Sequence, residues 1–138
     1  MKKILTAVGA LALLAALAAC GAGGGGVEKE FASGRVGNLT VALANSDGVL
    51  RNGDQELTVT FKDASGKPVD VGSASLNFYM PAMGSMPVMN DPATLTTTST
   101  PGVYRAKFSL QMGGEWQAQV AYEGPAGAGK GSFPVTAQ

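Results

Sequence analysis

The chain has 138 residues, enough for one domain, and carries 10 basic and 10 acidic side chains, so its formal net charge is zero. Its few basic residues form no cluster, and we expect no nucleic-acid partner. It contains no histidine and one cysteine, which excludes a histidine-based catalytic triad.

The N-terminus has the order of a secretory signal. Lys2 and Lys3 precede an apolar and small-residue run over residues 4–19, and Cys20 follows. The run is shorter than the roughly 20 residues that a membrane-spanning helix needs. The letters LAAC at residues 17–20 resemble the lipobox of bacterial lipoproteins. This resemblance implies removal of residues 1–19 and attachment of lipid to the Cys20 sulfur.

We therefore expect a signal peptide over residues 1–19 and a membrane-anchored protein of the bacterial cell envelope, facing the periplasm or the cell exterior. A lipidated Cys20 leaves no thiol for nucleophilic catalysis, and we predict no enzymatic activity. Residues 20–34 form a glycine-rich tether in this interpretation. Within it, Phe31 is either a first core contact or a residue on the membrane side.

From residue 35 onward the pattern is that of β-strands. Short segments alternate apolar and polar residues, with turn clusters such as residues 45–48 and 63–68 between them. The sequence predicts an all-β fold over residues 35–138, an immunoglobulin-like β-sandwich of about seven strands, with a small barrel as the alternative. The expected strands lie near residues 39–43, 57–61, 74–80, 93–98, 103–110, 116–122 and 132–136.

Four of the six methionines stand three residues apart within residues 80–89, which we call the methionine run. Thioether sulfur is a soft, uncharged donor that favours Cu(I). Pro81, Gly84 and Pro87 interrupt the run and predict an exposed loop. The candidate metal ligands are Met80, Met83, Met86, Met89 and, from a later loop, Met112.

Two other interpretations of the run remain open. Methionine also fills irregular gaps in a core, and it lines adaptable surfaces that bind other proteins. In a polyproline-like stretch all four side chains of the run would lie along one side. Met80 and Met89 could then share an ion only if the chain bends, and Gly84-Ser85 is where it can bend.

Successive loops of a sandwich alternate between its two ends. This alternation predicts that Met112 and the methionine run converge on one end, and that the tether joins at the opposite end, toward the membrane. Trp116 follows Met112 closely. We expect Trp116 to pack in the core, with a wall of the site formed by sulfur–aromatic contact as the second reading.

Three segments carry a resemblance to a known family: NFYMPAMGSMP (residues 77–87), PGVYRAKF (101–108) and GGEWQAQV (113–120). Together they resemble the YtkA-like and FixH-like domains of bacterial envelope proteins, over roughly residues 36–137. The resemblance implies an immunoglobulin-like sandwich and a link to copper handling. Related loops often include a histidine, whereas this chain has Ser85 there, which favours Cu(I) or Ag(I) over Cu(II).

Two functions follow as hypotheses. The first is a lipid-anchored copper chaperone or buffer with Cu(I) as its bound ion. The second is an interaction module whose methionine run grips a partner, such as an envelope metal-transport or oxidase-assembly protein.

Overall fold

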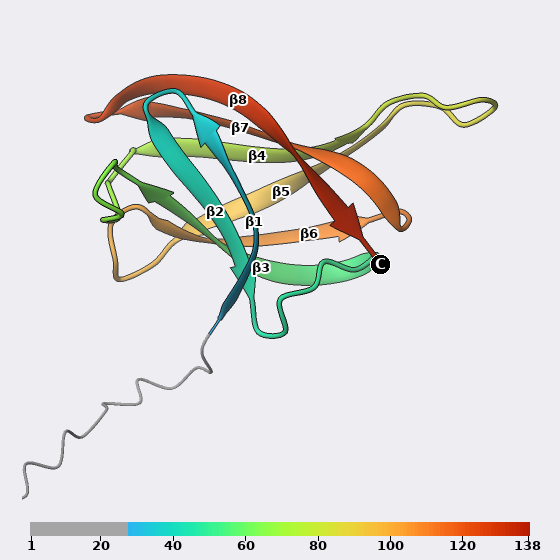
Figure 1. Ribbon diagram of the computed structural model, residues 1–138, viewed down its shortest axis with the longest axis horizontal. Helices are drawn as coiled ribbons and strands as arrows, with labels where there is room; N and C mark the ends of the chain where they lie inside the picture. Colours follow the sequence, from blue (N-terminus) through green and yellow to red (C-terminus); the bar gives the residue numbers. More distant parts are fainter. Residues whose placement is uncertain (1–27) are drawn as a thin grey trace, which may run out of the picture.

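The structure is a computed structural model, and it describes residues 28–138 as eight β-strands (Figure 1). No helix in this part of the chain is long and apolar enough to cross a membrane. The predicted signal peptide, Cys20 and the glycine-rich part of the tether lie outside the described residues. The strands are β1 (Lys29–Val36), β2 (Leu39–Asn45), β3 (Gly53–Lys62), β4 (Ser73–Met80), β5 (Met89–Thr97), β6 (Val103–Leu110), β7 (Gly114–Gly124) and β8 (Gly127–Ala137).

All neighbouring strands are antiparallel, in the order β1-β2-β3-β6-β5-β4-β7-β8. Strand β5 belongs to two layers, because residues 89–93 pair with β4 and residues 94–97 pair with β6. Strands β2–β8 thus follow the order of an immunoglobulin constant-type sandwich, with β2-β3-β6-β5 as one layer and β4-β7-β8 as the other. The predicted all-β sandwich is confirmed, with β1 as an additional strand.

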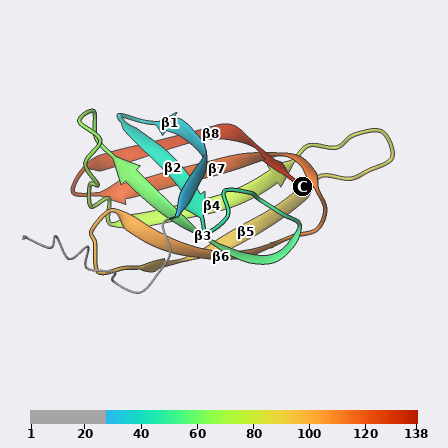
Figure 2. The ribbon, with the colours of Figure 1, turned by 60° about the horizontal axis from the view of Figure 1, so that its bottom comes forward.

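The two outer strands also lie against each other, which brings the sandwich close to a closed barrel. A Cβ atom on Gly34 of β1 would stand 2.4 Å from the Phe133 ring of β8, so the two backbones approach closely only because Gly34 has no side chain. Figures 1 and 2 show β1 and β8 on the same side of the molecule from two directions.

The core lies between the layers and is built by side chains that alternate along each strand between the inner and the outer face. Every second side chain is buried from Tyr104 to Leu110 on β6 and from Trp116 to Tyr122 on β7. Phe61 of β3 contacts Tyr104 and Tyr122 edge to face, at centroid distances of 5.6 and 5.7 Å. Each fully buried large apolar side chain contributes roughly 1.5–3 kcal/mol by leaving water.

Strand β1 changes two expectations about where the chain joins the sandwich. It begins at Lys29, so residues 29–34, assigned to the tether from the sequence, are part of the sheet. Phe31 forms a β-bulge between Glu30 and Ala32 and packs against the core, which decides between its two readings.

The described chain enters the sandwich at a point different from the predicted one. Lys29 pairs with Asn45, at the end of β2 from which the loop of residues 46–52 departs. This loop meets the C-terminus, where Gln138 donates its backbone N–H to the Leu50 carbonyl, and the C-terminus lies against Gly113. The next residue of β2 inward, Ala44, pairs with Thr58 in the middle of β3, and Glu28 bonds to Arg105 at 2.8 Å. The described chain therefore starts about halfway along the β2-β3-β6 layer, at neither end of the sandwich.

Candidate metal site at the methionine end

The methionine run forms a β-hairpin that projects beyond the sandwich, as Figures 1 and 2 both show. Strands β4 and β5 pair as far as Met80 and Met89, and a second pairing joins Met83 to Met86 in the same register. The Met83 N–H donates to the Met86 carbonyl at 3.1 Å, and the Met86 N–H donates to the Met83 carbonyl at 2.9 Å.

The turn of this hairpin consists of Gly84 and Ser85. Gly84 has φ 57°. A two-residue hairpin turn requires such a positive φ at its first residue, and glycine adopts it readily. In this register Pro81 faces Val88 at the next position where the strands would exchange hydrogen bonds, and Pro81 has no N–H to donate, which explains the gap in the ladder between the two methionine pairs. The chain therefore bends where the sequence indicated. The methionines are arranged as facing pairs across a hairpin and not along one side of a polyproline helix.

Met80 is a core residue. It continues the inward face of β4 after Leu76 and Phe78, and its side chain is 1% exposed. Its methyl group lies 3.4 Å from the position that a Cβ atom on Gly114 would occupy. Met80 thus lies beneath the loop that carries Met112, and its sulfur is not open to solvent.

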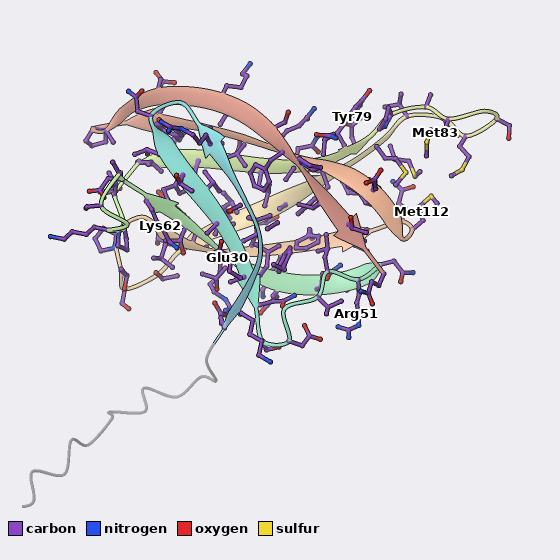
Figure 3. All side chains as sticks on the ribbon, in the orientation of Figure 1. Glu30, Arg51, Lys62, Tyr79, Met83 and Met112 are labelled. Atoms are coloured by element: carbon purple, nitrogen blue, oxygen red, sulfur yellow. The ribbon has the colours of Figure 1, made fainter. Side chains whose placement is uncertain are left out.

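The other methionines of the hairpin are more accessible. Met83 is 55% exposed, while Met86 and Met89 are half-buried, and Met89 packs against the core. Figure 3 shows the sulfur atoms gathered at this end of the molecule, with Met83 on the hairpin and Met112 on the neighbouring loop.

Met112 lies on the loop between β6 and β7, at the same end as the hairpin. It is half-buried and packs against the core. Trp116, which is fully buried, donates its indole Nε1–H to the Met112 carbonyl at 3.1 Å. Trp116 therefore supports the backbone of the Met112 loop from inside the core, in addition to its packing role.

Asp91 is a functional candidate that sequence reasoning missed. Its carboxylate is 9% exposed and accepts two hydrogen bonds from Gln111, from the backbone N–H at 3.1 Å and from side-chain Nε2 at 2.8 Å. The alternation of β5 could have indicated an inward Asp91, but its partner is 20 residues away and carries no sequence signal.

One cluster of charged side chains lies on the outer face of β3 and β6. There, Arg105 bonds to Glu28 at 2.8 Å and to Glu56 at 2.9 Å, and Lys107 reaches Glu56 at 3.3 Å. The hydrogen bond from Arg105, followed by the one from Lys107, lowers the pKa of Glu56. Within residues 28–138, no group of three or more histidine, cysteine, aspartate or glutamate side chains is arranged to hold a metal ion.

Comparison with known proteins identifies the family. The model of the YtkA-like family matches residues 35–121, more than half of the chain. The chain belongs to the YtkA-like family. The matched YtkA-like region includes the whole hairpin, Met112 and Trp116, and it excludes β8 and most of β1. No curated protein and no solved structure matches the chain.

Proposed function

We propose that this YtkA-like protein is a lipid-anchored envelope protein that binds Cu(I), or Ag(I), through methionine thioethers and acts as a copper chaperone or buffer. The observation that carries the proposal is the facing pair Met83 and Met86 at the end of a projecting hairpin, with Met112 on the adjacent loop. Thioether sulfur is a ligand type that selects Cu(I) over harder ions.

The geometry supports Met83 and Met86 as the accessible donors. Directly opposed residues on antiparallel strands have Cα atoms about 5.5 Å apart when they exchange both hydrogen bonds, and their side chains leave the same face. Two thioether side chains at that spacing are long enough to share one ion. Met89 at the base of the hairpin and Met112 on the adjacent loop are the further donors, and both are half-buried.

The burial of Met80 reduces the proposed donor set. A side chain that is 1% exposed and packed against Gly114 serves the core, and we assign Met80 to support of the hairpin. The proposed ligands are therefore Met83, Met86, Met89 and Met112, with Met80 beneath them.

One observation favours docking of a partner protein as a second function. Among residues 28–138, the large hydrophobic side chains that are strongly exposed are Met83 at 55% and Val88 at 47%, both on the hairpin. Exposed apolar residues that cluster in this way mark interaction sites. The predicted partner is an envelope metal-transport or oxidase-assembly protein, and a hairpin that delivers copper would need such a contact.

A Cu(I) titration against a chromophoric chelator tests the proposal. The protein is the full chain with Cys20→Ser, kept in detergent, so that neither a thiol nor a lipid contributes. The double variant Met83→Leu and Met86→Leu retains apolar bulk, and we expect it to lose Cu(I) affinity while its fold remains intact. Met80→Leu is the matched control, and its affinity should equal that of the parent. If the parent protein has no measurable affinity for Cu(I), the proposed copper function fails and docking of a partner protein remains as the second function.

A further inference from the structure

Two hydrogen bonds join the base of the methionine hairpin to the loop that carries Met112. Both end on the carboxylate of Asp91 in β5, and both start from Gln111, through its backbone N–H and its side-chain amide. Because Asp91 is nine-tenths buried, water cannot easily replace these donors. The connection is therefore a fixed clamp between two segments that are far apart in sequence.

Each residue of the clamp is close in sequence to a candidate ligand. Asp91 follows Met89 by two positions on one strand, so their side chains leave the same face of the sheet. Gln111 directly precedes Met112. On the other side of Met112, the Trp116 indole N–H binds the Met112 carbonyl. The backbone of Met112 is thus held from both directions, and its side chain packs on the same core as that of Met89.

We infer that Asp91 is a positioning residue that holds Met112 against the base of the hairpin, so that a thioether from a second loop is in place before the ion arrives. The inference rests on the proposed Cu(I) site. Groups that orient metal ligands without touching the metal typically change its affinity 10- to 100-fold when removed, because the ligands lose their fixed orientation.

Two substitutions at one position separate positioning from packing. Asp91→Ala removes both acceptors. Asp91→Asn keeps the shape and two hydrogen bonds, because its oxygen accepts from the Gln111 backbone while its amide donates to the Gln111 side-chain oxygen after that amide turns over. In the Cu(I) titration we expect Asp91→Ala to lose about tenfold or more in affinity and Asp91→Asn to stay within about twofold of the parent.

Asn77→Ala is the matched control for a lost pair of hydrogen bonds. The Asn77 side-chain amide of β4 donates to Asn90 of β5 at 3.1 Å and to Gln119 of β7 at 2.9 Å, on the outer face of these strands. This variant removes a similar cross-strand connection without touching the Met112 loop, and its affinity should match that of the parent. Thermal unfolding of all three variants is the check that each is folded at the titration temperature.

A second measurement needs no metal. With ¹³C-labelled methionine methyl groups, the Met112 resonance of the metal-free protein should move in Asp91→Ala and stay in place in Asp91→Asn and Asn77→Ala. An Asp91→Ala variant with the affinity of the parent and an unmoved Met112 signal would overturn the inference and leave the Cu(I) site standing. A parent without affinity would overturn the proposed function, and the inference with it.

Discussion

Met83 and Met86 exchange both backbone hydrogen bonds across the Gly84-Ser85 turn, so the two thioethers are presented together at the outermost part of the protein. This pairing depends on the backbone conformation of one residue. Gly84 has φ 57°, and a Cβ atom there would meet nothing within 4 Å. Only the left-handed conformation, and no steric contact, therefore requires glycine at this position.

The first prediction concerns that turn. We expect Gly84→Val to disrupt the hairpin end, since a β-branched residue at positive φ costs about 1–3 kcal/mol, and to weaken Cu(I) binding by separating the pair. Gly66→Val is the control, because Gly66 has φ 84° and open space around it, in a turn outside the hairpin. The control should change stability without changing the affinity. Equal affinities for all three proteins would show that the turn does not organise the ligands.

The second prediction concerns oxidation by hydrogen peroxide. Conversion to the sulfoxide follows exposure, so Met83 at 55% should oxidise first and Met80 at 1% last. Peptide mapping by mass spectrometry at short times measures the order. The sulfoxide carries oxygen on the donor sulfur, and Cu(I) affinity should fall as Met83 and Met86 react. Affinity that persists after both are fully oxidised argues against these two ligands.

The third prediction is that Cu(I) affinity changes little between about pH 7 and pH 5, where an imidazole site would begin to protonate. Thioethers take up no proton in this range, and the chain has no histidine. The measurement is the chelator competition at both pH values, corrected for the chelator's own titration. A steep loss of affinity toward pH 5 contradicts ligation by thioethers alone.

The fourth prediction concerns acid stability. Hydrogen bonds from Arg105 and then Lys107 hold the pKa of Glu56 below its ordinary value of 4.5. A carboxylate with a lowered pKa in the folded state stabilises the fold above its unfolded pKa, and this contribution is lost as the pH falls through the folded pKa. Thermal stability should therefore decline below about pH 4.5, outside the range of the copper titration.

Glu56→Gln should flatten this decline, because glutamine has no proton to bind. Glu123→Gln, the same change at a carboxylate outside these ion pairs, is the control. The Glu56 cluster is exposed, so the difference should shrink as salt is added. An acid transition that is identical in the parent and in Glu56→Gln would place the pH sensitivity elsewhere.

Period-two alternation was sufficient to predict seven of the strands, because each of them buries one face. It did not predict β1, in which the bulge at Phe31 breaks the alternation and small residues occupy much of the strand. The missing strand also displaced the expected entry of the chain, since β1 runs back along β2 and starts about halfway along the sheet.

The candidate site could be predicted only in part from the sequence pattern. The regular spacing of the run suggested four equivalent methionines, yet Met80 also continues the inward alternation of Leu76 and Phe78, a signal that was present in the sequence. The clamp between Asp91 and Gln111 could not be predicted, because it depends on the register of β5 against β6 and on the path of the loop after β6.

The most direct test of the central claim is X-ray absorption at the copper K-edge of the Cu(I)-loaded protein carrying Cys20→Ser. We predict a first shell of sulfur atoms only, with fewer sulfur atoms when Met83 and Met86 are both leucine. A first shell made of nitrogen or oxygen atoms, or a sulfur shell unchanged by the double substitution, would contradict it.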